Sequence, residues 1–208
     1  MKSLLKYSFI LLFLMCLSTE AQAQFVRQQT QSSEFFFDAV VFKSQDSLDG
    51  RVDVYAMVPY ESLEFMKSDK VWGAKFSMIF HISDSAGNRV ASKKIERTLA
   101  ENDYFTAQGG TGAFVTINLS FFLRKGRYDI EALLTDNFSK KEFTRSRVIN
   151  ILDFDDFDFS LSGILLVSSI EETDGKYKIT PHISDNVGML KDNFFIFFES
   201  YNNAELDT

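Results

Sequence analysis

Apolar and polar residues alternate along much of the chain with a period of two. The clearest run lies at 51–58, and a longer one follows at 72–82. Shorter runs of the same kind cover 115–119 and 128–134. Strict alternation over such lengths is typical of half-buried β-strands. The apolar members of the two main runs are Val52, Val54, Ala56, Val58, Trp72, Ala74, Phe76, Met78, Phe80 and Ile82.

The breaks between these runs have the composition of tight turns. "DSAGN" at 84–88 and "DNFSK" at 136–140 each join two strand-like runs. Asp and Asn bond their own backbone in turns, and Gly supplies a positive φ. The segment 59–69 predicts one short helical turn or an edge strand. About seven short strands between Glu34 and Leu152, without a long helix, predict an all-β, immunoglobulin-like β-sandwich over 34–152.

The pattern changes at "DFDDFDF", residues 153–159, which we interpret as an acidic-aromatic linker. Three strand candidates follow at 160–170, 176–185 and 193–202. They are too few for a complete sandwich, so we predict a second, small or truncated β domain over 160–208. Its last strand, "NFFIFFESYN", is apolar enough to need covering on both faces. This predicts that more chain follows Thr208.

The N-terminus has the features of a secretory signal peptide over residues 1–23. Two lysines precede an apolar run, and Ala21-Gln22-Ala23 provides a small-residue cleavage site. The run is shorter than the roughly 20 residues that span a bilayer, which disfavours a permanent anchor. Large residues before Cys16 disfavour lipid modification there. Residues 24–33 are Gln/Ser-rich and predict a flexible leader. We therefore expect an exported protein, periplasmic or at the cell surface or secreted, without a transmembrane segment in the mature chain.

Cleavage after Ala23 changes what the mature chain contains. It removes two lysines and one glutamate, which moves the net charge from −7 to −8, and it removes the only cysteine. The mature chain therefore forms no disulfide of its own, and its stability must come from core burial. The full chain has 23 phenylalanines, of which 21 follow Ala23, and they provide apolar surface for such a core. The acidic balance argues against nucleic acid as a partner.

The linker contains the best candidate for a metal site. Asp153, Asp155, Asp156 and Asp158 place several carboxylates close together, and Ca²⁺ binds six to eight oxygens. The run lacks the Gly and the terminal Glu of an EF-hand loop. The alternative is a solvated linker whose three phenylalanines reach the two cores. Apart from this Ca²⁺ hypothesis, the sequence indicates no cofactor.

The only two histidines, His81 and His182, each begin a His-Ile-Ser-Asp-x-x-Gly stretch. The flanking residues differ, and Pro181 before the second copy has no counterpart, so no domain-length repeat is visible. Recurring turn chemistry accounts for the Ser, Asp and Gly positions. One His and one Asp supply two ligands at most, where a metal site needs three or four.

Motifs for catalysis are missing from the sequence. "QGGTG" at 108–112 lacks the following Lys-Ser/Thr of a phosphate loop, and we interpret it as a loop between strands. Neither histidine accompanies a Gly-x-Ser-x-Gly motif. Carboxylates distant in sequence can meet for glycoside chemistry, but nothing in their spacing favours it. We therefore expect a protein that is not an enzyme.

Several segments, in this order, resemble the N-terminal part of GWxTD domain-containing proteins, a family of exported bacterial proteins. The resemblance implies a first β-sandwich and a following segment, and it implies no catalytic residues. The Gly-Trp-x-Thr-Asp signature itself is absent, and Trp72 is the only tryptophan. Pro181-His182 stands where the family shows Pro-Asn before a basic residue. The segments are "FFFDAVVFKS", "GRVDVYAMVPYESLEF", "KGRYDIEALLTD", "FSLSGILLV", "ITP" and "FFESYN".

These observations favour an exported bacterial envelope protein that acts as a non-catalytic protein-binding or structural module. Its expected partners are other envelope proteins, contacted through exposed strand edges or the aromatic-rich 193–202 segment. Two alternatives stay open. One is the accessory N-terminal part of a longer envelope enzyme, and the other is a calcium-dependent adhesion module. No small-molecule ligand can be named from the sequence.

Overall fold

The computed structural model describes residues 34–45, 50–173, 176–183 and 193–203, and these described residues belong to one compact unit. The fold is all-β with a few short helical turns, which confirms the predicted class. The signal peptide at 1–23 and the leader at 24–33 lie outside the described residues. The strands are β1 (Phe36–Lys43), β2 (Gly50–Pro59), β3 (Met66–Ser68), β4 (Val71–Asp84), β5 (Arg89–Glu101), β6 (Phe114–Leu123), β7 (Gly126–Asp136), β8 (Glu142–Ile151), β9 (Phe159–Leu161), β10 (Leu165–Thr173), β11 (Lys176–Pro181), β12 (Phe195–Phe197) and β13 (Ser200–Asn202).

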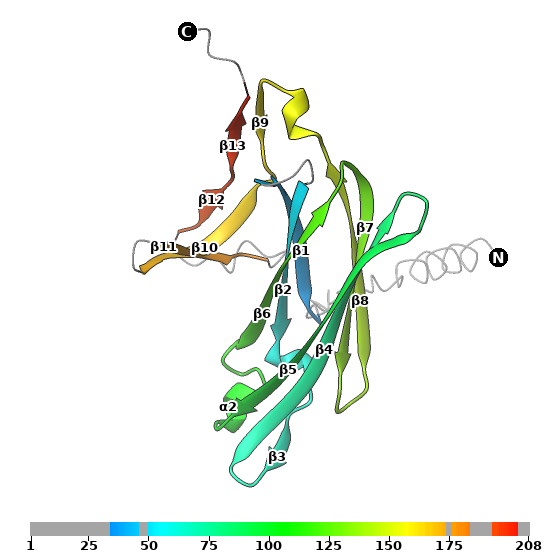
Figure 1. The fold of residues 1–208 in the computed structure, drawn as a ribbon. Helices are drawn as coiled ribbons and strands as arrows, with labels where there is room; N and C mark the ends of the chain where they lie inside the picture. The colour runs from blue at the N-terminus through cyan, green and yellow to red at the C-terminus, as the bar shows by residue number, and fades with distance from the viewer. Residues whose placement is uncertain (1–33, 46–49, 174–175, 184–192, 204–208) are drawn as a thin grey trace, which may run out of the picture. The chain divides into compact units, whose positions relative to one another are not determined.

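Strands β1 to β8 form two antiparallel sheets that face each other (Figure 1). One sheet has the order β1-β2-β6. In the other, the order is β3-β4-β7-β8, and β5 also pairs with β4. The chain therefore changes sheet three times, after β2, after β5 and after β6, because β6 pairs with β2 whereas β7 pairs with β4. The immunoglobulin-like assignment within the all-β class stays a prediction.

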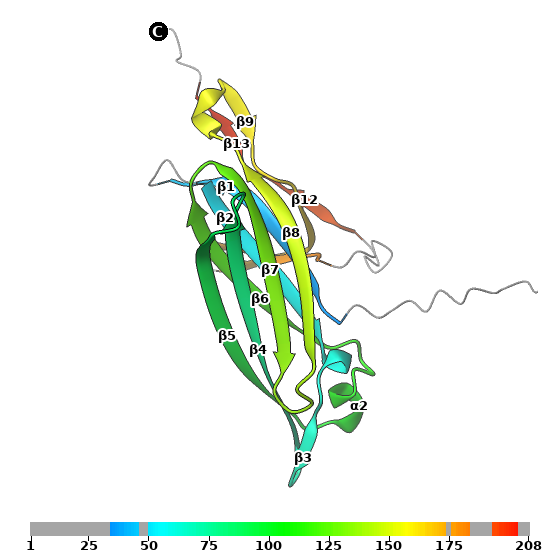
Figure 2. The same cartoon turned by 90° about the vertical axis from the view of Figure 1, so that its right-hand side faces the viewer.

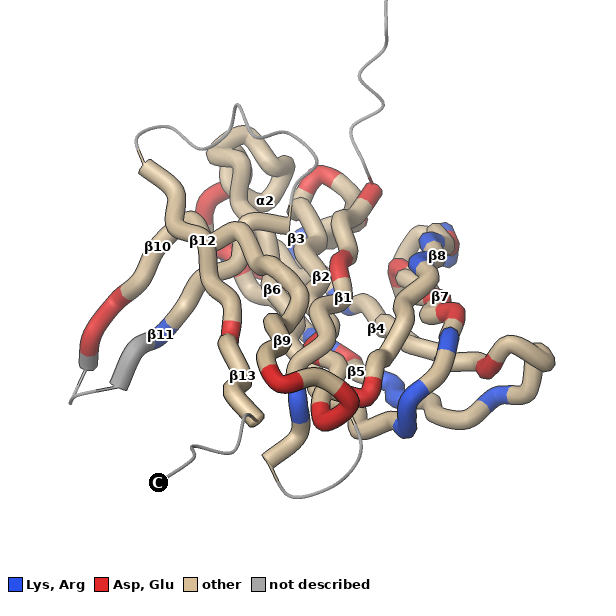
Figure 3. Tube along the Cα trace, turned by 90° about the horizontal axis from the view of Figure 1, so that it is seen from above, with Lys and Arg blue, Asp and Glu red and all other residues tan. Residues whose placement is uncertain are grey.

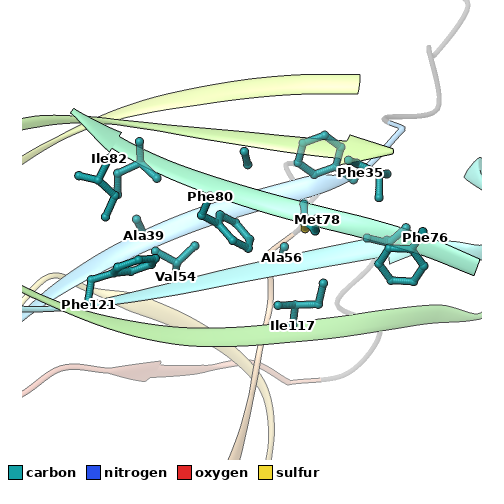
Figure 4. Packing of buried hydrophobic residues seen from close by; sticks show 14 of the residues in the cluster. Phe35, Ala39, Val54, Ala56, Phe76, Met78, Phe80, Ile82, Ile117 and Phe121 are labelled. Atoms are coloured by element: carbon teal, nitrogen blue, oxygen red, sulfur yellow. The ribbon is translucent and has the colours of Figure 1, made fainter. Parts of the chain in front are cut away.

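The core between the two sheets is formed by the residues whose alternation predicted the strands (Figure 4). Val54 and Ala56 of β2 face Phe76, Met78 and Phe80 of β4, and all five are fully buried. A fully buried side chain of this size contributes about 1.5–3 kcal/mol relative to an exposed one. The alternating pattern of the sequence thus fixes which face of each strand enters the core.

The connections follow from local chemistry. The segment 59–69 contains both predicted alternatives, a 3₁₀ turn η1 (Tyr60–Ser62) and the edge strand β3. Before the glycine-rich 108–112 loop, the chain forms the short helix α2 (Tyr104–Ala107), whose first turn is capped by the Asp103 carboxylate. The 108–112 segment is a loop, as expected, with Gly109 and Gly112 at positive φ.

The C-terminal strands cover the outer face of the β1-β2-β6 sheet (Figure 2). They form a three-stranded sheet of order β11-β10-β12 and a two-stranded sheet of β13 and β9. Val40 and Phe42 of β1 pack against Leu165 and Val167 of β10 in a second hydrophobic cluster. The described part of this region has five strands where three candidates were predicted, because the first and last candidates are each interrupted. The division into domains 34–152 and 160–208 stays a prediction.

Candidate functional site

The segment around β12 exposes apolar side chains to solvent on its outer side. The pairing register sets Leu166 opposite Ile196, between the pairs Leu165–Phe197 and Val167–Phe195. Leu165, Val167 and Phe197 pack in the second hydrophobic cluster against β1. Ile196 therefore points away from β1 and is 56% exposed. We define the β12 patch as Ile164, Phe194, Ile196 and Phe198, which are 65%, 52%, 56% and 49% exposed.

Phe197 anchors this strand. Its ring lies 6.1 Å from that of Phe42, centroid to centroid, inside the second hydrophobic cluster. Residues 159–167 and 194–203 pair through β10 with β12 and through β9 with β13, and we call these two segments the ribbon. Further along it, Phe159 and Leu161 of β9 are also exposed. An apolar surface this concentrated on two paired segments is typical of protein-protein contact sites, whereas single exposed apolar residues are ordinary.

A polar network fixes the far end of the ribbon to the sandwich. Nη2 of Arg51 lies 3.0 Å from Oε1 of Glu199, and the Tyr201 hydroxyl donates to Oε2 of Glu199 at 2.6 Å. The same hydroxyl accepts from the N–H of Lys43 at 2.9 Å. Nε of Arg51 also lies 3.2 Å from Asp53. These contacts hold the backbone next to the β12 patch in a defined position.

Burial and charge in this network shift three pKa values. Desolvation raises the pKa of Tyr201 to about 12, and the hydrogen bond to Glu199 adds to it. Desolvation likewise raises the pKa of Tyr55 to about 12, with Asp53 as the next cause. For Arg51, desolvation acts to lower the pKa, but the carboxylates of Asp53 and Glu199 outweigh it and raise the value. All three groups therefore keep their protons at neutral pH, and Arg51 and Tyr201 both donate to Glu199.

The four aspartates predicted as Ca²⁺ ligands lie before and beside β9. Asp153 accepts from the Asp155 N–H in the first turn of a 3₁₀ helix, η2 (Phe154–Asp156), and its carboxylate pairs with Lys125 at 3.0 Å. Asp155 pairs with Lys43 at 2.5 Å. The carbonyl of Asp158 accepts from the backbone of the ribbon's last residue, Asn203. Within the described residues, no three His, Cys, Asp or Glu side chains are arranged to hold a metal ion. The Ca²⁺ site stays a prediction.

The side chain of Asn203 completes the connection to the linker. Its Nδ2 donates to the carbonyls of Phe154 and Phe157 at 2.7 and 2.9 Å, and its Oδ1 accepts from Lys43 at 3.0 Å. Phe154 is buried against Tyr201, with ring centroids 5.1 Å apart, whereas Phe157 and Phe159 are exposed. The linker therefore contributes one phenylalanine to the interior, where the alternative interpretation expected three.

The two histidines lie in different parts of the fold. His81 lies on the outer face of β4, where its Nδ1 is 3.0 Å from Oγ of Ser92. His182 follows β11, and its N–H donates to Leu166 of β10. The predicted turn of the first copy is present, because Asp84 accepts from the Ala86 and Asn88 backbones. The turn of the second copy lies outside the described residues.

His81 borders an open basin of about 470 Å³ on the outer face of the larger sheet. Its rim carries charges of both signs, including Arg89, Arg127, Asp129 and Glu131. These side chains are exposed, and Nδ1 of the His81 ring lies within hydrogen-bond distance of a hydroxyl on the neighbouring strand, that of Ser92. The basin therefore offers an open polar surface with charges of both signs.

Sequence reasoning missed Arg51, Glu199, Tyr201 and Asn203 as a group, because they join strands far apart in the chain. One signal was available on β2. Tyr55 and Met57 occupy the face predicted to be polar, which indicates that this face is covered as well. In the structure Tyr55 is 8% exposed and packs in the second hydrophobic cluster.

Comparison of the sequence with protein-family models gives no match, and comparison with curated proteins gives none. The described part of the chain contains no helix long and apolar enough to cross a membrane.

Proposed function

We propose that this chain is an exported protein of the bacterial cell envelope that binds another protein through the β12 patch and has no catalytic role of its own. The observation that carries the proposal is the exposure of Ile164, Phe194, Ile196 and Phe198 on one ribbon. Burying apolar surface of this kind on a partner yields roughly 25 cal/mol per Å². The signal-peptide pattern supports export to the periplasm or beyond.

The two-sheet architecture supports an immunoglobulin-like sandwich as the frame of this module. Within this frame β5, β6 and β7 lie in alternate sheets, so the chain crosses the sandwich and returns, as it does in Greek-key sandwiches. We further propose kinship with the N-terminal region of GWxTD domain-containing proteins, supported by the quoted segments. A rigid sandwich and an anchored ribbon suit a binding role, because little conformational entropy is lost on association.

Site-specific photo-crosslinking in cells that produce the native protein tests this function. A photoreactive residue at Phe198 samples the β12 patch, and one at Val148, on the outer face of β8, is the matched control. The two side chains are 49% and 47% exposed, so exposure alone does not distinguish them. We expect a discrete protein adduct from position 198 and none from position 148. Equal labelling at both positions, or none at 198, would overturn the proposal.

A further inference from the structure

We propose that the free edge of β12 binds an extended, apolar segment of the partner as an added β-strand, and that Lys or Arg residues flank this segment. This inference rests on the proposed function and specifies its binding mode and partner chemistry. Three features support it: the direction of the β12 backbone, the protection of β5 and β8 in the larger sheet, and the distribution of charge.

The backbone of β12 presents hydrogen-bonding groups to its free edge. The carbonyl of Leu166 accepts from the His182 N–H on the β11 side of β10. Leu166 therefore directs its backbone groups away from β12, and the pair Leu166–Ile196 is a non-hydrogen-bonded pair of the antiparallel ladder. In such a pair the partner also faces outward, so the N–H and C=O of Ile196 point to the free edge. Within the described residues no strand pairs with that edge.

The next residues on this edge continue the pattern. Beyond β12, both the carbonyl and the N–H of Glu199 are bonded to Ser162, on the inner side of the ribbon. By alternation, Phe198 faces outward like Ile196. Two outward residues with apolar side chains thus offer both a main-chain template and side-chain contacts, which is the combination used in strand addition.

The edges of the larger sheet are protected in a way that β12 is not. On β5, Lys93 points inward, where its Nζ donates to the Ser120 carbonyl at 2.6 Å and lies 4.7 Å from the centroid of the Phe121 ring. On β8, Arg147 points inward to Asp38 at 3.0 Å. Inward-pointing charges of this kind hinder pairing with a further strand. In contrast, β12 consists of Phe195, Ile196 and Phe197 alone.

The charge distribution favours a basic partner. Residues 153–208 contain twelve Asp and Glu against three lysines, a net charge of −9, whereas residues 24–152 contain sixteen against seventeen Lys and Arg, a net charge of +1. The whole negative excess of the mature chain thus lies in the part that carries β12. A second copy of this chain would bring the same charge to the edge, so repulsion disfavours self-pairing and attraction favours a basic segment.

The acidic residues lie toward both ends of the ribbon. Asp158 is bonded through its backbone to Asn203, at the β13 end. Glu171 and Glu172 lie on β10 beyond the last residue paired with β12. Figure 3 shows these acidic positions at the end of β10 and before β9. All three side chains are exposed and make no ion pair within the described residues. This arrangement fits a partner segment that has Lys or Arg residues at both ends of an apolar strand.

The test uses two synthetic peptides with the same alternating Val-Thr core, one flanked by Lys pairs and the other by Glu pairs. Fluorescence anisotropy measures their binding to the purified mature chain and to two variants. Ile196→Pro removes the outward N–H, a change that edge strands tolerate. Ile196→Val keeps it. We expect the Lys-flanked peptide to bind the wild type and Ile196→Val with similar affinity. Its affinity for Ile196→Pro should be about tenfold lower, and high salt should weaken binding to all three proteins.

A second variant tests the charge preference without changing β12, and its result does not depend on whether Ile196→Pro folds. Glu171→Gln combined with Glu172→Gln leaves β12 intact and should reduce the preference for the Lys-flanked peptide. Failure of the Lys-flanked peptide to bind, equal binding of both peptides, or equal binding to the Pro and Val variants would each overturn strand addition. A cross-link from Phe198 that persists in those cases would leave the proposed function standing, and loss of that cross-link would overturn the function itself.

Discussion

Arg51 and Glu199 are 148 residues apart in sequence, and Nη2 of Arg51 lies 3.0 Å from Oε1 of Glu199. The pair joins β2 to the residue between β12 and β13. Both side chains are partly exposed, so the pair by itself adds only about 0.5–1 kcal/mol to stability. Its main effect is to hold the backbone after Phe198 in place, together with the Tyr201 hydroxyl, which bonds both Glu199 and the backbone of Lys43.

The raised pKa values of Tyr55 and Tyr201 predict a loss of stability at high pH. Both values are about 12 in the folded protein, above the ordinary value of 10.0, and the first cause in each case is desolvation. The unfolded chain therefore releases these protons first as pH rises. Their contribution is complete below about pH 10 and is lost as pH rises through about 12.

Urea unfolding at about pH 9 and about pH 11 measures this loss. Tyr55 is the more buried of the two, and its share is at most about 2 kcal/mol. We expect Tyr55→Phe to make the free energy of unfolding less dependent on pH over this range, and Tyr201→Phe to do so to a smaller extent. The same pH dependence in the wild type and in the double variant would contradict the assignment.

The strands of the sandwich were predictable because their side chains alternate. In β2 and β4 one face is uniformly apolar and lies in the core, as the sequence indicates. In β5 the signal is weak, because Lys93 and Arg97 occupy inward positions opposite Phe80 and Phe76 of β4. An edge strand with inward charges resembles a polar loop in sequence, although its register is regular.

The sequence predicted that the segment around β12 is rich in aromatic residues, but not which of its side chains face the solvent. The run at 193–202 indicated an aromatic strand, but its direction depends on the pairing of Ile196 with Leu166, which no local pattern specifies. The network of Arg51 and Glu199 was not predictable for the same reason. Pairings between residues more than a hundred positions apart are set by the tertiary fold, and turn chemistry or periodicity reports only on neighbours.

The contacts at Gly163 show how closely the segment before β10 approaches β1. A Cβ added there would lie 2.8 Å from Cγ1 of Val40, which is itself buried, and the Gly163 N–H donates to the Val41 carbonyl at 2.8 Å. Gly163→Ala should therefore lower the free energy of unfolding by about 1–3 kcal/mol. Gly73→Ala is the control, because its Cβ would have no neighbour closer than 3.8 Å. Denaturant unfolding compares them, and equal stability of the two variants would refute the close approach.

The buried carboxylate of Asp136 is expected to contribute strongly to the stability of the fold. The residue is 1% exposed, and its side chain accepts from the N–H of Glu64 at 2.6 Å, the N–H of Phe138 at 2.9 Å and the Ser139 hydroxyl at 2.8 Å. Asp136→Ala leaves these donors without an acceptor and should cost about 2–4 kcal/mol. Asp129→Ala, at an exposed site on the same strand, should change stability by less than about 0.5 kcal/mol. Thermal unfolding followed by circular dichroism distinguishes the two.

The response to Ca²⁺ tests the aspartate-rich linker. Two of its four carboxylates already have cationic partners, since Asp153 pairs with Lys125 and Asp155 pairs with Lys43. A Ca²⁺ ion would have to displace both ammonium groups before it could use these oxygens. We therefore expect the Tm of the purified protein to be the same in EDTA and in millimolar Ca²⁺. A higher Tm in Ca²⁺, abolished by Asp156→Asn combined with Asp158→Asn, would instead establish the calcium site. A double variant, Lys43→Met with Lys125→Met, is the further control. It frees the carboxylates of Asp155 and Asp153, so if Ca²⁺ binds here, the increase in Tm on adding Ca²⁺ should be larger in this variant than in the wild type.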